Sequence, residues 1–201
     1  MTDDSLGPDS SALVRRAAEG DDAALEDLLR QAEPSLRARV SINPRWRRSL
    51  SEDDVLQVSY LEAFLRIGSL RSPSSRAFWS WMARIVDNNL RDAIRALERE
   101  KRPDARRRQT VGERGESART LLARVCAGAE TAGAAVVRDE ELTRLEAAVE
   151  KLPSTYRRVV EALDLAEREV AEVATELGRS PGAVHLLRSR AHRRLAELLR
   201  G

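Results

Sequence analysis

Aromatic side chains stand directly beside a series of Arg and Asn side chains in one stretch of the sequence. Residues 78–102 read FWSWMARIVDNNLRDAIRALEREKR. An α-helix turns by about 100° per residue, so side chains three or four positions apart share a face. On that spacing one face carries a cationic stripe bordered by a ring: Trp81, Arg84, Asn88, Arg91 and Arg95. Guanidinium groups hold phosphates and a flat ring stacks on an exposed base, so the stripe suits a displaced single strand of nucleic acid.

The opposite arc of the same helix is apolar, and we expect it to pack in a core. Phe78 and Trp79 belong to this arc, which favours core packing over base stacking for both rings. Asn89 falls midway along the arc. A buried amide there needs a hydrogen-bond partner from another part of the chain.

A helix-turn-helix is predicted by residues 170–189, VAEVATELGRSPGAVHLLRS. Ala174 is small where two helices must approach, and Gly178 follows four residues later to make a tight turn. Ser180 is a good N-cap and Pro181 suits the first helical position. The first helix is acidic and the second is cationic, which favours duplex DNA binding by the second helix. The alternative is an ordinary helical hairpin with solvated Arg side chains.

Two kinds of DNA contact are expected from this second helix. Ser180 lies at its start, and the residues expected on its exposed N-terminal part, within reach of base edges, are Gly182, Ala183, His185, Leu186 and Ser189. The residues better placed for phosphates are Arg179, Arg188, Arg190 and Arg193.

No catalytic or metal site is expected. The sequence shows no nucleophile with its base, no phosphate-binding Gly loop and no paired carboxylates. His185 and His192 are seven residues apart, but no Cys or neighbouring acid completes a zinc site. A single cysteine, Cys126, excludes an internal disulfide. We therefore expect no enzyme, no cofactor and no bound metal.

Helices must position all of these residues, and apolar residues recur at intervals of three and four nearly throughout the 201-residue chain. We predict an all-α protein of two small helical domains, residues 1–101 and 139–201, joined by a flexible linker, residues 102–138. Pro34 is expected to kink or break the second helix. The predicted helices are 11–19, 22–40, 51–67, one ending near 101 that carries the opening stretch, a short one at 120–127, 139–151, 154–164, 168–177 and 181–200.

Charge and hydropathy limit where the protein acts. Net charge is only +2, but 34% of residues are charged and almost every cation is Arg, which favours nucleic acid unless it merely reflects codon usage. No segment approaches the roughly 20 apolar residues of a membrane span, and the acidic N-terminus is unlike a signal peptide. We expect a soluble protein in the cytoplasm.

Two segments together resemble the bacterial RNA polymerase sigma factors of the extracytoplasmic-function group. SEDDVLQVSYLEAFLRI, residues 51–67, followed by residues 78–102, resembles region 2 of these proteins. Residues 152–199 resemble region 4, helix-turn-helix included. The resemblance implies a protein that binds core RNA polymerase and promoter DNA, recognises a minus-35 element through region 4 and helps to open the minus-ten element through region 2. It also implies a possible anti-sigma factor as a partner.

A polymerase-docking site follows from the resemblance. The family's DDxxQ-like motif maps to Asp53, Asp54 and Gln57, which share the first turns of one helix. Carboxylates there suit a basic partner. Ser51 and Asp54 also have the spacing of a capping box, so the acids could serve only as caps. The stripe on the following helix corresponds to the part that melts and reads the minus-ten element, and residues 69–75 would hold a flipped base.

The chain also departs from the family. Glu167 and Arg168 stand where Gly and Leu are frequent, and Leu187 stands where a cation is frequent. The promoter sequence therefore cannot be carried over. Two other functions stay open: a stand-alone helix-turn-helix regulator, and an all-helical interaction or adaptor protein.

Overall fold

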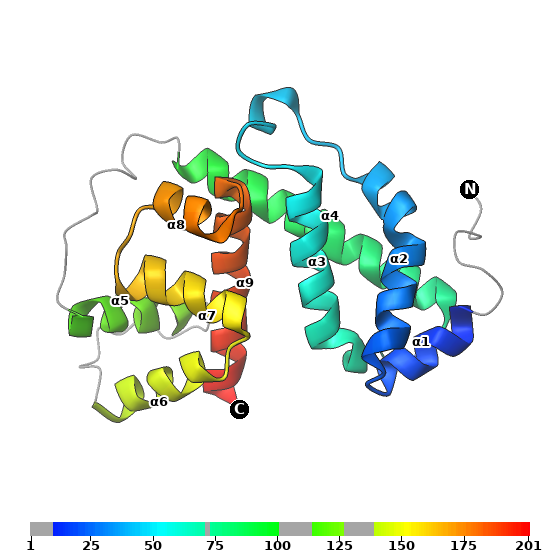
Figure 1. Ribbon diagram of the computed structural model, residues 1–201. Coiled ribbons are helices and arrows are strands. Elements are labelled where there is room, and N and C mark those ends of the chain that lie inside the picture. The colour runs from blue at the N-terminus through cyan, green and yellow to red at the C-terminus, as the bar shows by residue number, and fades with distance from the viewer. Residues whose placement is uncertain (1–9, 71–72, 101–113, 127–138) are drawn as a thin grey trace. The chain divides into compact units, whose positions relative to one another are not determined.

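The computed structural model describes residues 10–70, 73–100, 114–126 and 139–201. Within these ranges every regular element is a helix, as Figure 1 shows, which confirms the all-α prediction. The chain divides into two compact units, Met1–Arg95 and Ala96–Gly201. No helix in the described ranges is long and apolar enough to cross a bilayer.

The first unit consists of α-helices and two short 3₁₀ turns. Its elements are α1 Ser10–Ala18, α2 Asp22–Arg39, η1 Pro44–Trp46, α3 Glu52–Arg66, η2 Ile67–Ser69 and most of α4 Ser75–Glu100. Helix α2 continues through Pro34, so the expected break is absent. Leu28 and Leu36, on either side of the proline, are fully buried, and this packing offsets the backbone hydrogen bond that proline cannot make.

Helix α3 begins with the predicted capping box. Ser51 Oγ accepts a hydrogen bond from Asp54 N at 3.1 Å, while Asp54 Oδ2 accepts one from Ser51 N at 3.0 Å. Two backbone donors that the helix itself cannot satisfy are thereby paired. The cap fixes the start of the helix that carries the candidate docking residues.

Helix α4 buries most of its predicted apolar arc, but Trp79, also assigned to that arc, is only half-buried. Phe78, Met82 and Val86 have no exposed surface. Asn89, midway along the arc, is also fully buried, and its Nδ2 donates to Ser59 Oγ on α3 at 2.9 Å. The predicted need for a buried partner is thus confirmed, and α3 supplies it.

The second unit is built around its last helix. Its remaining elements are α5 Arg114–Cys126, α6 Asp139–Glu150, α7 Ser154–Val160, the π-helical turn η4 Glu161–Leu165, α8 Val170–Leu177 and α9 Pro181–Arg200. Helix α9 contacts α5, α6, α7 and α8 (Figure 1). Val184, Ala191 and Leu195 on α9 are fully buried and form an apolar seam along one face of the helix.

The helix-turn-helix α8–α9 has the predicted local chemistry. Gly178 adopts a left-handed conformation with φ of 61°, which glycine reaches without steric cost. Ser180 Oγ accepts a hydrogen bond from Ala183 N at 3.2 Å, and Pro181 is the first helical residue. These three residues end α8 and start α9 within the four positions 178–181.

Candidate nucleic-acid interface

The cationic stripe lies on the side of α4 opposite its buried arc. Arg84, Arg91 and Arg95 are exposed, and Asn88 is half-buried. Arg91 Nη1 donates to Asn88 Oδ1 at 3.1 Å, so two members of the stripe hold each other in place. The helical phase inferred from the sequence is therefore the phase in the structure.

The aromatic side chains of α4 differ in their surroundings. Phe78 is fully buried, as expected, whereas Trp79 and Trp81 are both half-buried. The ring centroids of Phe78 and Trp81 are 6.1 Å apart with an interplanar angle of 45°. Phe78 therefore braces one part of the Trp81 ring while another part stays accessible to a stacking partner.

An acid beside the stripe is neutralised by an Arg that sequence reasoning did not single out. Asp87 precedes Asn88, and its two carboxylate oxygens accept from Arg39 Nε at 2.9 Å and from Arg39 Nη2 at 2.7 Å. These hydrogen bonds raise the pKa of Arg39. The bidentate pair reduces the repulsion that Asp87 would otherwise exert on a nucleic-acid strand.

The candidate docking residues on α3 do not form one exposed patch. Asp53 is exposed and its Oδ1 lies 2.7 Å from Arg37 Nη2, and Gln57 is also exposed. Asp54 is only 7% exposed because both of its roles in the capping box turn it toward the backbone. Asp53 and Gln57 are the members of the motif that face outward.

The recognition helix α9 is more deeply buried than expected. Arg179 and Arg193 are exposed, while Ser180, His185 and Ser189 are half-buried. The expected exposure is wrong for four residues, which are buried: Gly182, Ala183, Leu186 and Arg190. The physical reason is that α9 is the central helix of its unit and has neighbours on several sides.

Arg188 does not point outward as a phosphate contact would. Its Nη2 lies 2.6 Å from Asp164 Oδ1, and its Nε donates to both oxygens of the same carboxylate. His192 Nε2 is 2.9 Å from Asp164 Oδ2, and because a carboxylate only accepts, that nitrogen donates. Arg124 Nη1 on α5 completes the group at 3.3 Å from Oδ1.

Burial and charge act in opposite directions on Asp164. Burial raises its pKa, but the hydrogen bond from His192 and the charge of Arg188 lower it, so that the pKa lies below its usual range. Sequence reasoning missed this residue. The available signal was an acid between Leu163 and Leu165 in a segment predicted to be helical.

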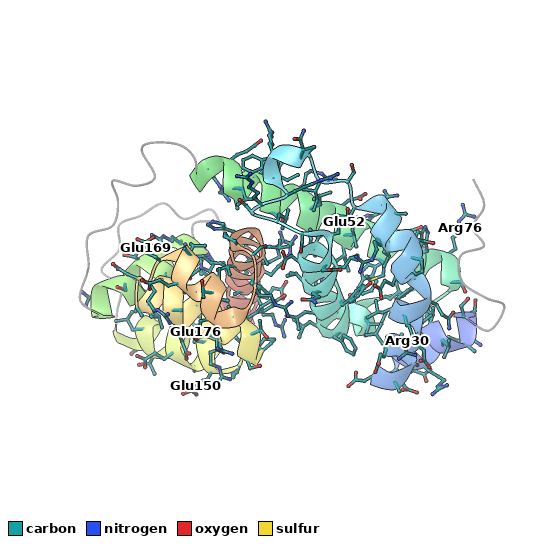
Figure 2. The ribbon with its side chains drawn as sticks, turned by 45° about the horizontal axis from the view of Figure 1, so that its top comes forward. Arg30, Glu52, Arg76, Glu150, Glu169 and Glu176 are labelled. Atoms are coloured by element: carbon teal, nitrogen blue, oxygen red, sulfur yellow. The ribbon has the colours of Figure 1, made fainter. Side chains whose placement is uncertain are left out.

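The acidic helix of the hairpin is partly neutralised as well. Glu176, labelled in Figure 2, accepts from Arg168 Nη1 at 2.7 Å and from Arg158 Nη2 at 3.1 Å. These hydrogen bonds lower the pKa of Glu176. Helix α8 therefore repels a nearby DNA strand less strongly than its composition suggests.

Glu167 precedes α8 in a conformation that an L-residue rarely adopts. Its φ is 50°. Its Oε1 accepts from Ser117 Oγ on α5 at 2.7 Å. The unusual backbone and the contact with α5 occur at the same residue.

No group of three or more His, Cys, Asp or Glu side chains in the described ranges could hold a metal ion. His185 and His192 are no exception, since the acid beside His192 is Asp164, which is already shared with two Arg side chains.

Comparison with known proteins agrees with this arrangement. The family model for sigma-70 region 4 matches residues 142–195, which hold the helix-turn-helix. The sigma factor SigM of Mycobacterium tuberculosis, an ECF RNA polymerase sigma factor, is 28% identical over 191 residues, covering 95% of this chain and 84% of SigM. The ECF RNA polymerase sigma factor SigD of Mycobacterium bovis is 29% identical over 190 residues, covering 92% of this chain and 82% of SigD.

One solved structure, described as an RsbN-BldN complex, is 21% identical to this chain, with a TM-score of 0.30, and the match covers 92% of this chain and 98% of that chain. Residues 142–195 thus match sigma-70 region 4, and along nearly its whole length the chain is similar to ECF RNA polymerase sigma factors.

Proposed function

We propose that this sigma factor binds core RNA polymerase, selects a set of promoters and helps to open their minus-ten element. Residues 1–101 would dock on polymerase and hold the melted strand, residues 102–138 would link, and residues 139–201 would recognise the minus-35 element. The observation that carries the proposal is the division of α4 into a buried apolar arc and an exposed cationic stripe beside the partly accessible ring of Trp81.

Energetics support a role for α4 in strand opening. Stacking one base on an aromatic ring contributes roughly 1–3 kcal/mol. Unstacking a base from the duplex costs a few kcal/mol. Trp81 together with phosphate contacts from Arg84, Arg91 and Arg95 therefore offsets the cost of an exposed base, without any covalent step.

Polymerase docking is proposed for the outward-facing part of α3. Asp53 and Gln57 offer a carboxylate and an amide one helical turn apart, which suits a basic helix or coiled coil. Asp54 contributes through the cap, by fixing where the helix starts. The ion pair between Asp53 and Arg37 is exposed, so a partner can replace it at small cost.

Minus-35 recognition is proposed for the accessible part of α9 and the turn before it. Arg179 and Arg193 are exposed and suit phosphates, while His185 and Ser189 are half-buried and suit base edges. Ser180 acts by capping the helix. The polymerase and the promoter together imply that the protein acts in the cytoplasm, and the family resemblance supports an anti-sigma factor as an additional partner.

Transcription from a promoter library by core polymerase, with and without the protein, tests the proposal. Specific initiation that requires the protein supports it, and sequencing of the transcripts identifies the promoters. Duplex binding without any effect on polymerase would instead indicate a stand-alone regulator. Absence of both activities, with retained binding to another protein, would indicate an adaptor.

A further inference from the structure

A buried carboxylate joins α9 to α5, another helix of the same unit. Asp164 lies in η4, and its side chain has 0% exposure. From α9, Arg188 and His192 contact its two oxygens, and from α5 Arg124 does so. The partners are 24, 28 and 40 residues away along the chain. This cluster, Asp164 with Arg124, Arg188 and His192, is called the Asp164 cluster below.

Stability gives no sufficient reason for the Asp164 cluster. A carboxylate loses its hydration on burial and is tolerated only where cations and hydrogen bonds replace the water. Well-packed apolar residues in place of a buried ion pair are often neutral or stabilising. The cluster does, however, determine where one charge of the recognition helix points.

Asp164 binds Arg188 through the edge of the guanidinium group that carries Nε and Nη2. Nε donates to both oxygens of Asp164 at 3.1 and 3.2 Å, and Nη2 donates to Oδ1 at 2.6 Å. A phosphate binds through the same fork of donors, so Arg188 cannot hold Asp164 and a phosphate by this edge at once. Arg193 is exposed and lies further along the same helix toward its C-terminus.

We propose, on the basis of the function proposed above, that Asp164 is a positioning residue for minus-35 recognition. It keeps Arg188 out of contact with phosphates and so limits the number of ionic contacts that α9 makes with any duplex. Fewer non-specific contacts leave a larger share of the binding free energy to base edges, which increases discrimination between promoters. Arg124 extends the same constraint to α5.

The salt dependence of DNA binding tests this role, because each added phosphate contact steepens the plot of log affinity against log salt by about 0.9. Holoenzyme is assembled from core polymerase and the full chain, and it binds a duplex promoter identified by the transcription experiment. Asp164→Asn keeps the shape and removes the charge. We expect a slope steeper by about 0.9 and tighter binding to a scrambled duplex.

Two further variants separate positioning from folding. Arg188→Gln alone should leave the slope unchanged, and combined with Asp164→Asn it should restore the wild-type slope. Arg193→Gln is the matched control, and its slope should become shallower by about 0.9. A purely structural defect would weaken binding without steepening the slope.

The proposal is overturned if Arg188→Gln makes the slope shallower in the wild-type background, because Arg188 then contacts a phosphate. The comparison of Arg188→Gln with the wild type does not involve Asp164→Asn, so it remains valid even if circular dichroism shows Asp164→Asn to be unfolded. An unchanged slope in a folded Asp164→Asn also overturns it. Absence of promoter-specific binding by the wild-type holoenzyme would instead refute the proposed function itself.

Discussion

Asn89 on α4 donates to Ser59 Oγ on α3 across the core of the first unit, with 2.9 Å between Nδ2 and Oγ. Ser59 Oγ in turn donates to Val55 O at 2.7 Å, and both side chains have no exposed surface. The chain of donors holds α4, which carries the cationic stripe, against α3, which carries the candidate docking residues. It fixes the register of the two helices in a way that apolar packing does not.

Removing the hydroxyl should destabilise the first unit. Ser59→Ala takes a hydrogen-bond partner from a buried amide, and we expect the free energy of unfolding to fall by about 1–3 kcal/mol. All three tryptophans, Trp46, Trp79 and Trp81, lie in this unit, so their fluorescence in a urea titration reports on it. The control is Ser69→Ala, whose exposed hydroxyl donates to Arg66 O and whose loss should change little.

Strand opening should depend on the ring at residue 81 rather than on the one at residue 79. Trp81→Ala should reduce open-complex formation by roughly tenfold, since it removes about 1–3 kcal/mol of stacking, whereas Trp81→Phe keeps a flat ring. Permanganate reactivity of unpaired thymines in the promoter measures the open complex. Trp79→Ala is the matched control. An equal loss of open-complex formation in both alanine variants would show that the two rings contribute only to packing within the protein.

Polymerase affinity should depend on Asp53 and not directly on Asp54. Asp53→Arg reverses an exposed charge, and we expect core polymerase to bind at least tenfold more weakly, with fluorescence-detected stability nearly unchanged. Ser51→Ala removes the cap instead and should lower stability by about 1 kcal/mol. If the affinity for core polymerase falls only in proportion to the loss of stability in both variants, Asp53 has a structural role and does not contact polymerase.

Features that depend on residues close together in the sequence were predicted correctly, and features that depend on packing between distant segments were not. The phase of Arg84 and Arg91 on α4 and the capping box at Ser51 are local, because they follow from spacing within one helix. The burial of Leu186 and the pairing of Arg188 are not local, since they depend on elements that pack around α9 from elsewhere in the sequence.

The helix within the expected linker shows the same limit. A short helix was predicted at 120–127, and α5 spans Arg114–Cys126. Leu121, Leu122 and Val125 on α5 are buried, because the helix contacts α6, η4 and α9. Weak periodicity in the sequence indicated the helix, but no pattern indicated what it would pack against.

Acid should destabilise the second unit through Asp164. Its pKa is lower in the folded state than in the unfolded chain, so its contribution is complete above the unfolded pKa of about 4 and is lost as the pH falls through the folded pKa. The difference in unfolding free energy between wild type and Asp164→Asn should therefore shrink below about pH 4. Urea titrations followed by circular dichroism measure it, and a difference independent of pH would contradict the ionised state.

Replacing Glu167 by glycine should stabilise the second unit when the hydrogen bond between Glu167 and Ser117 is already absent. A left-handed φ costs an L-residue about 1–2 kcal/mol, of which about 0.5–1 is offset because glycine gives the unfolded chain more freedom. Glu167→Gly also removes the hydrogen bond from Ser117, which contributes about 0.5–1.5 kcal/mol. In a Ser117→Ala background the strain is the remaining effect, and there we expect Glu167→Gly to raise the unfolding free energy by about 0.5–1 kcal/mol. In the wild-type background the two effects should nearly cancel. Destabilisation by glycine in both backgrounds, measured by urea titration, would show that the conformation of residue 167 carries no strain.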